Sequence, residues 1–91
     1  MAVFKIGDVV FSEAKNACGV IKVISLGSDS VGVEFFQNIG GHNLEKGGKA
    51  YCKTGYGWFC GINHIKMINK TILKQIVDYK LYLKMKKYIK E

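Results

Sequence analysis

Residues 20–36 read VIKVISLGSDSVGVEFF, and this stretch decides the fold. Residues 20–26 are mostly β-branched and apolar, as in a strand that curves around a core. Residues 27–30 are small and polar, which is typical of a turn. Residues 31–35 then resume the apolar pattern, so the whole stretch predicts a β-hairpin.

The second strand of this hairpin alternates in character. Val31, Val33 and Phe35 occupy every second position, and successive side chains of a strand point to opposite faces of a sheet. We therefore expect these three side chains to face a core. Gly32 and Glu34 are expected to face away from it.

Three further segments of the chain resemble strands. Residues 3–11 are apolar apart from Lys5 and a Gly7-Asp8 pair, which indicates a strand with a turn or bulge in it. Residues 56–60 and 64–68 are short enough to form two closing strands. Five short strands without helix signals predict a small, mainly β barrel within residues 1–68.

The composition describes one small globular domain. The 91 residues are 48% hydrophobic and 12% aromatic, which is too apolar for a disordered chain. No apolar run is long enough to cross a bilayer, and the N-terminus lacks a secretion signal. Three cysteines are an odd number without a framework spacing. These features predict a reduced, cytoplasmic protein without a membrane role.

The charge is strongly positive and comes from lysine alone. Fourteen lysines stand against seven acids, which gives a formal net charge of +7, and the chain contains no arginine. Planar, bidentate reading of phosphate or guanine normally uses arginine. The sequence thus predicts a diffuse positive field. Its lysines gather towards the C-terminus, at positions 66, 70, 74, 80, 84, 86, 87 and 90.

Residues 69–91 predict a basic C-terminal helix. Asn69 is a suitable N-cap, and residues 70–90 contain neither glycine nor proline. Two apolar stripes run along the helix, Ile72, Ile76, Tyr79 and Leu83 on one face and Leu73, Val77 and Leu81 on another. Two arrangements explain this pattern equally well. In one, the helix packs on the barrel through one stripe and the second stripe forms a homodimer. In the other, the helix lies in a groove that buries both stripes.

Residues 37–55 form a long segment rich in glycine. Long loops in compact domains are often functional, although the glycines here match no P-loop or dinucleotide motif, and turn chemistry is the simpler reading. Aromatic residues stand beside lysines at its end: Lys49, Tyr51, Lys53, Tyr56, Trp58 and Phe59. Trp58 and Phe59 are neighbours on a predicted strand, so one ring is expected in the core and the other is available for binding.

Five short motifs carry a resemblance to a known group of proteins. They are FKIGDVV at 4–10, GVIKV at 19–23, VGVEFF at 31–36, GGHNL at 40–44 and GYGWF at 55–59. Together they resemble the small SH3-like proteins encoded by phages and prophages of Gram-positive bacteria.

The resemblance spans roughly residues 3–68 and does not include the lysine-rich helix. It implies an SH3-like β-barrel and a phage context. Phage proteins of this size often bind and block a component of the bacterial host, including CRISPR and other defence systems, which is an analogy at the level of the fold.

Metal binding and catalysis both have weak signals. His42, Cys52, Cys60 and His64 are residue types that zinc accepts, but nine, seven and three residues separate them and no Cys-x-x-Cys knuckle occurs. A Cys60–His64 dyad has no carboxylate nearby to orient it. We therefore expect no catalytic residue, no cofactor and no metal, with the zinc question left open.

The sequence predicts a non-enzymatic protein that docks on a host protein or ribonucleoprotein complex. The alternatives are a nucleic-acid-binding barrel and, third, a protein that sequesters a nucleotide-derived signal. The lysine-rich helix is equally well explained as a solvated face. The expected partner-binding residues are His42, Asn43, Lys49, Tyr51, Lys53, Tyr56, Trp58, Lys74, Lys80, Lys84 and Lys87.

Overall fold

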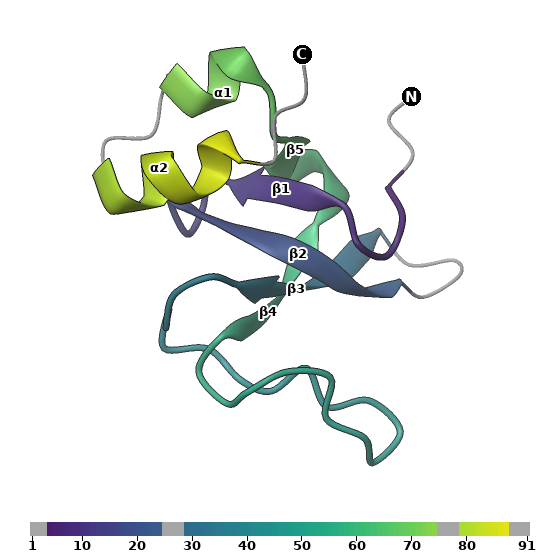
Figure 1. The fold of residues 1–91 in the computed structure, drawn as a ribbon. Helices are drawn as coiled ribbons and strands as arrows, with labels where there is room; N and C mark the ends of the chain where they lie inside the picture. Colours follow the sequence, from purple (N-terminus) through teal and green to yellow (C-terminus); the bar gives the residue numbers. More distant parts are fainter. Residues whose placement is uncertain (1–3, 25–28, 75–78, 88–91) are drawn as a thin grey trace.

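The protein is mainly β, as predicted. The computed structural model describes residues 4–24, 29–74 and 79–87. Its strands are β1 (Val9–Ser12), β2 (Ala17–Ile24), β3 (Ser30–Phe35), β4 (Gly57–Gly61) and β5 (Ile65–Met67). Figure 1 shows these strands with two short helices on one side and a long loop on the other.

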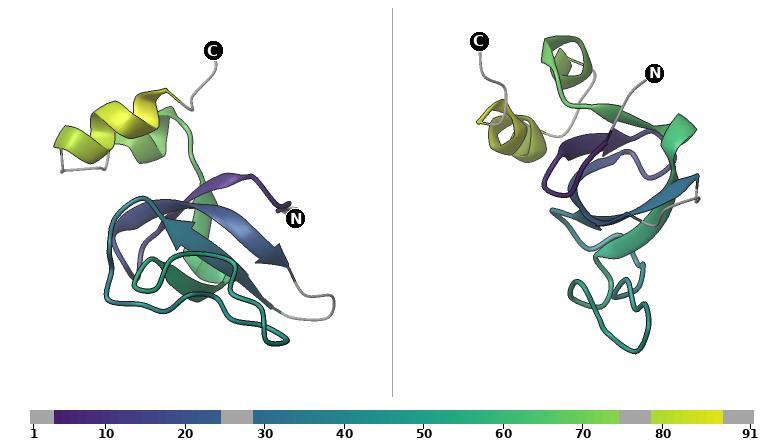
Figure 2. Two further views of the ribbon diagram at one scale, coloured as in Figure 1. Left: turned by 60° about the horizontal axis from the view of Figure 1, so that its bottom comes forward. Right: turned by 90° about the vertical axis from the view of Figure 1, so that its right-hand side faces the viewer.

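The five strands make one antiparallel sheet in the order β4-β3-β2-β1-β5. The predicted hairpin is confirmed, since β2 pairs with β3, with a shift of register between Ile21 and Val23. The edge strands β4 and β5 follow each other in the chain and are joined by a 3-10 turn, η1 (Ile62–His64). The sheet is strongly curved, and its strands wrap around a common centre (Figure 2).

The concave side of the sheet holds the larger core. Val31, Val33 and Phe35 are all buried there, which confirms the alternation read from the sequence. They pack with residues from the other strands, namely Val10, Ala17, Ile21, Cys60 and Ile65. Burial of these apolar side chains is the main force that stabilises the curved sheet.

The N-terminal strand is shorter than predicted. Gly7 has a φ of +98°, a conformation that glycine adopts readily, and the chain turns there. The backbone N–H of Asp8 donates to the carbonyl of Lys5 at 3.0 Å, and a carboxylate oxygen of Asp8 accepts from the N–H of Lys5 at 2.9 Å. The Gly7-Asp8 pair is therefore a turn that still hydrogen-bonds to Ile21, and the regular strand β1 begins only at Val9.

The C-terminal segment is helical, but it is not one rod. Helix α1 (Lys70–Lys74) and helix α2 (Tyr79–Lys86) lie beside each other over β1 (Figures 1 and 2). This arrangement differs from the single helix expected over residues 70–90. Folding back lets both helices reach the same part of the sheet. Ile76 and Val77 of the predicted stripes lie outside the described residues.

The helices bury a second, smaller core on the convex side of the sheet. Leu73, Leu81 and Met85 pack there with Phe11 and Cys18 of the sheet, and all five side chains are buried. Tyr79 and Leu83, from the other predicted stripe, are 71% and 44% exposed. The stripe that contains Leu73 and Leu81 is thus the one that faces the protein.

The loop from β3 to β4 covers another part of the convex side. Leu44 is completely buried beneath it, with a φ of +56°. The expectation that Gly32 faces solvent is wrong, because this loop covers it. A Cβ atom at Gly32 would lie 3.0 Å from Val23, 3.1 Å from Phe59 and 3.3 Å from Leu44. The long loop is therefore a packed part of the fold.

Candidate functional site

Three aromatic side chains gather where the loop meets β4. The rings of His42 and Trp58 are stacked with centroids 5.3 Å apart, and the rings of His42 and Phe59 are 5.4 Å apart. Trp58 is 39% exposed and Phe59 is 38% exposed. We call His42, Trp58 and Phe59 the ring cluster. It is a large, partly apolar surface that remains open to solvent.

Backbone pairing holds the ring cluster in place. The N–H of His42 donates to the carbonyl of Gly57 at 2.8 Å, and the N–H of Gly57 donates to the carbonyl of His42 at 2.8 Å. A Cβ atom at Gly57 would lie only 2.6 Å from both Cys52 Sγ and Leu44 Cγ. Glycine at position 57 thus allows the loop to approach β4 closely enough to stack His42 on the strand.

A hydrogen bond within the loop determines which ring nitrogen of neutral His42 carries the proton. Its Nδ1 atom accepts the backbone N–H of Leu44 at 3.1 Å, so in the neutral ring the proton resides on Nε2. The same hydrogen bond sets the direction of the imidazole plane. The ring cluster is therefore organised before any partner arrives.

The expectation that one of Trp58 and Phe59 is a core residue is wrong. Trp58 pairs with Val33 and Phe59 pairs with Gly32, so the two rings do lie on opposite faces of the sheet. However, β4 is an edge strand, and among the described residues its outer flank meets only the isolated bridge between His42 and Gly57. The buried positions of this strand are Gly57 and Cys60 instead.

Lysines stand next to the exposed rings. The Nζ atom of Lys15, in the turn between β1 and β2, lies 3.8 Å from the centre of the Trp58 ring. Two of the expected site lysines also lie near rings: Lys49 lies 5.1 Å from the Tyr51 ring, and Lys53 lies 5.7 Å from the Tyr56 ring. Cation–π contacts of this kind stabilise both partners. Lys15 was not foreseen because only the fold brings it to Trp58.

Asn43 has a structural place in the loop. Its side-chain oxygen accepts the N–H of Glu45 at 3.0 Å, and its carbonyl accepts the N–H groups of Tyr51 and Cys52 at 3.0 and 3.1 Å. These hydrogen bonds close the loop on itself. The polar groups of Asn43 thus hold the segment that carries the predicted site residues.

A shallow pocket of about 500 Å³ lies between β2 and the tip of the loop. It brings the predicted Lys49 and Tyr51 together with residues that the sequence did not single out: Ile6, Lys22, Val23, Ile24, Lys46 and Gly47. Ile6 is 65% exposed. This pocket has aliphatic walls and a rim of lysines.

The helices that carry the C-terminal lysines lie on the side of the sheet away from the loop tip (Figure 1). Lys80 and Lys84 line a second pocket with Phe36, and the Nζ atom of Lys84 is 4.9 Å from the Phe36 ring. Lys74 and Lys87 are exposed, and the pockets and ring pairs found within the described residues do not include them. The predicted lysines therefore do not form one continuous site.

The four residues that were considered as zinc ligands do not converge. The Cys52 thiol faces the backbone carbonyl of His42 at 3.7 Å, and the Cys60 thiol faces the carbonyl of Trp58 at 3.8 Å. No group of three or more histidine, cysteine or acidic side chains suited to a metal occurs among residues 4–24, 29–74 and 79–87.

The thiols are in environments that favour their protonated forms. Burial raises the pKa of Cys18 to about 12 and also raises the pKa of Cys60, where a hydrogen bond from Ser12 opposes it. The pKa of Cys52 is raised by burial and by the charge of Glu34. A thiol with a raised pKa is a weak nucleophile at neutral pH.

Comparisons with known proteins leave the chain unassigned. No model of a protein family matches it, and no curated protein matches it. Within the part of the chain that the structure describes, no helix is both long and apolar enough to cross a membrane.

Proposed function

We propose that this chain is a non-enzymatic binding protein of the phage type, which docks on a protein or complex of the bacterial host and blocks it. The observation that carries the proposal is the ring cluster, in which Trp58 and Phe59 remain more than a third exposed on a fixed backbone. Defence complexes such as CRISPR effectors are the first class of target to test.

The fold within this proposal is an SH3-like barrel. The strand order β4-β3-β2-β1-β5 supports this fold. Its two edge strands, β4 and β5, are consecutive in the chain and are connected by one short turn. The sequence motifs at residues 4–10 and 55–59 support it as well. In the structure, the first motif leads into β1 and the second contains most of β4.

The chemistry of the exposed surface favours a protein partner. Tryptophan and other large rings supply much of the binding energy in protein interfaces when a partner removes them from water. Aliphatic side chains are exposed as well, among them Ile6, Ile24, Met67 and Leu83. A nucleic acid gains little from contact with such groups. The lysines then favour a partner with an acidic surface.

The proposal predicts that Trp58→Ala abolishes docking without unfolding the protein. Tagged wild-type protein is incubated with host lysate and recovered, with and without nuclease treatment. A stoichiometric host protein should be captured by the wild type after nuclease treatment and lost in Trp58→Ala. Tyr79→Ala is the matched control, since Tyr79 is exposed on α2, away from the ring cluster.

Purified CRISPR effectors provide the direct functional assay. A complex that rests on buried apolar contacts should survive about 0.5 M salt, because screening weakens mainly exposed charge pairs. Capture that is equal for wild type and Trp58→Ala, or that disappears with nuclease, contradicts docking through the ring cluster.

Nucleic-acid binding is the second candidate, and the pairing of lysines with exposed rings favours it. Lys15 with Trp58 and Lys53 with Tyr56 each combine a positive charge with a stacking surface, as single-strand binding proteins do. Affinity for oligonucleotides should then fall steeply with salt. Undetectable binding at about 50 mM salt would exclude this candidate.

A further inference from the structure

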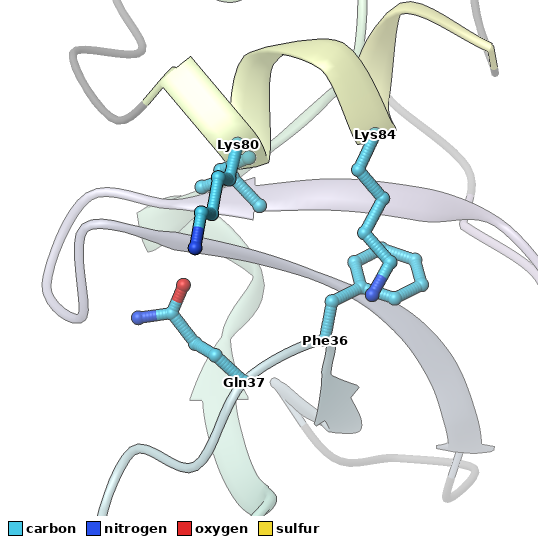
Figure 3. A pocket seen from close by; sticks show the side chains of 5 residues that line it. Phe36, Gln37, Lys80 and Lys84 are labelled. Carbon is cyan, nitrogen blue, oxygen red and sulfur yellow. The ribbon is translucent and has the colours of Figure 1, made fainter.

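A pocket of about 240 Å³ lies at the seam between helix α2 and the start of the loop. It is lined by Phe36, Gln37, Lys80, Leu81 and Lys84, and we call it the seam pocket. Figure 3 shows the side chains of Lys80 and Lys84 extending from the helix towards Gln37 and Phe36. Helix α2 and the start of the loop, which cover different parts of the sheet, thus line one small pocket together.

The polar part of the seam pocket is cationic. Lys80 and Lys84 are four residues apart on α2, so their charges stand on the same side of the helix. The described residues that line the pocket include no acidic side chain. Like charges at this spacing repel each other, and an anion bound between them would relieve the repulsion. The side-chain amide of Gln37 can add a hydrogen bond.

The remaining walls of the pocket are apolar. Phe36 is half-buried and Leu81 is 7% exposed, and the Lys84 Nζ atom lies 4.9 Å from the Phe36 ring. A bare phosphate would leave these walls without a contact. An acidic side chain has methylene groups to place against them and a carboxylate to place between the lysines.

We propose that the seam pocket receives a glutamate side chain from an acidic segment of the protein partner. This inference rests on the proposed function, because it takes the partner to be a protein. The methylene groups of the glutamate pack on Phe36 and Leu81. Its carboxylate accepts hydrogen bonds from Lys80, Lys84 and the Gln37 amide. The partner therefore presents an exposed glutamate in addition to the surface that meets the ring cluster.

The test is an NMR titration of the full chain with the blocked peptide acetyl-Gly-Glu-Gly-amide. Saturable shifts should appear at the Gln37 side-chain amide and at the Lys80 and Lys84 side chains. The peptide with glutamine in place of glutamate should bind about tenfold more weakly, because it cannot accept charge-assisted hydrogen bonds as strongly.

A matched pair of variants separates a specific pocket from a general positive field. Lys80→Gln/Lys84→Gln should weaken peptide binding about tenfold. Lys5→Gln/Lys86→Gln removes the same charge from exposed residues outside the pocket and should leave the affinity unchanged. Equal losses in the two double variants would overturn the proposal, since they would show a diffuse effect.

Two further probes identify the source of the anion. Inorganic phosphate and a short oligothymidylate are titrated under the same conditions. Tighter binding of either probe than of the glutamate peptide would overturn the assignment to an acidic protein segment. Loss of host-protein capture in Trp58→Ala is measured separately. If only the seam-pocket proposal fails, the peptide does not bind but capture still depends on Trp58. If the docking proposal fails, capture does not depend on Trp58.

Discussion

The convex side of the sheet is covered in two different ways, and the contrast bears on the binding surface proposed above. Helices α1 and α2 place Leu73, Leu81 and Met85 over β1, and these side chains are buried. The loop after β3 buries one large side chain completely, Leu44. Beside it, Trp58 and Phe59 remain more than a third exposed.

The difference follows from what each segment contributes. A helix delivers several apolar side chains to one face at regular spacing, so it can seal a surface. The loop is rich in glycine and is held mainly by backbone hydrogen bonds, such as the His42–Gly57 pair. It fixes the backbone while leaving rings uncovered. The helix-covered side thus serves stability, and the loop-covered side is suited to recognition.

Truncating one buried residue on each side should have the largest effect. Leu44→Ala and Met85→Ala each remove a completely buried side chain, and each should lower the free energy of unfolding by about 3 kcal/mol. Denaturant unfolding measures this loss. Only Leu44→Ala should change the fluorescence of Trp58, the single tryptophan, in the folded protein.

The reverse result would break the comparison. If Met85→Ala perturbs Trp58 as much as Leu44→Ala does, the two coverings are coupled and do not act as separate parts. Leu44→Met is a suitable control for the loop, because it keeps an apolar side chain of similar volume and should cost far less stability.

The buried thiol of Cys18 should make the stability of the protein depend on pH. The pKa of Cys18, under the helices, is about 12 against an ordinary value of 9.0, so the folded state holds this proton more tightly than the unfolded state. Its contribution to stability is complete below pH 9 and is lost as the pH rises from 9 towards 12. The loss is at most about 1.4 kcal/mol per pH unit.

Unfolding measured from pH 8 to pH 10.5 checks this effect, with Cys18→Ala as the control that lacks the titrating group. The wild type should lose more stability over this range than the variant. In the folded protein at pH 8, a thiol reagent should modify the partly exposed Cys52 before Cys18. Parallel pH profiles for the two proteins would contradict the sealed helix-covered core.

The contact between Lys15 and Trp58 should have the smallest effect. Lys15→Gln removes the ammonium group that lies 3.8 Å from the ring, and we expect a loss of about 0.5 kcal/mol of stability at this exposed site. The emission of Trp58 should shift because its surroundings change. Lys15→Arg should preserve both properties, and an unchanged emission in Lys15→Gln would show that the contact does not form.

Much of the sheet could be read from the sequence, because alternation reports directly on burial. Val31, Val33 and Phe35 were placed correctly for this reason. Gly32 was not, because a loop distant in sequence returns to cover it, and local periodicity carries no record of such a contact. The same limit explains why the approach of Lys15 to Trp58 was not foreseen.

The site was only partly predictable. Lys49 with Tyr51 and Lys53 with Tyr56 are close in sequence, and the structure places each pair together. The positions of Trp58 and Phe59 depend on β4 being the edge of the sheet, which alternation within one strand cannot reveal. The seam pocket joins Phe36 to α2 and therefore also depends on tertiary contacts.

The most direct test of the central claim is capture of a host protein after nuclease treatment, compared for wild type, Trp58→Ala and Leu83→Ala. Trp58 belongs to the ring cluster, where β4 meets the loop, and Leu83 is an exposed apolar residue of α2. Capture should be lost in Trp58→Ala and retained in Leu83→Ala, with both variants still folded. Retention in Trp58→Ala together with loss in Leu83→Ala would contradict recognition through the loop-covered side.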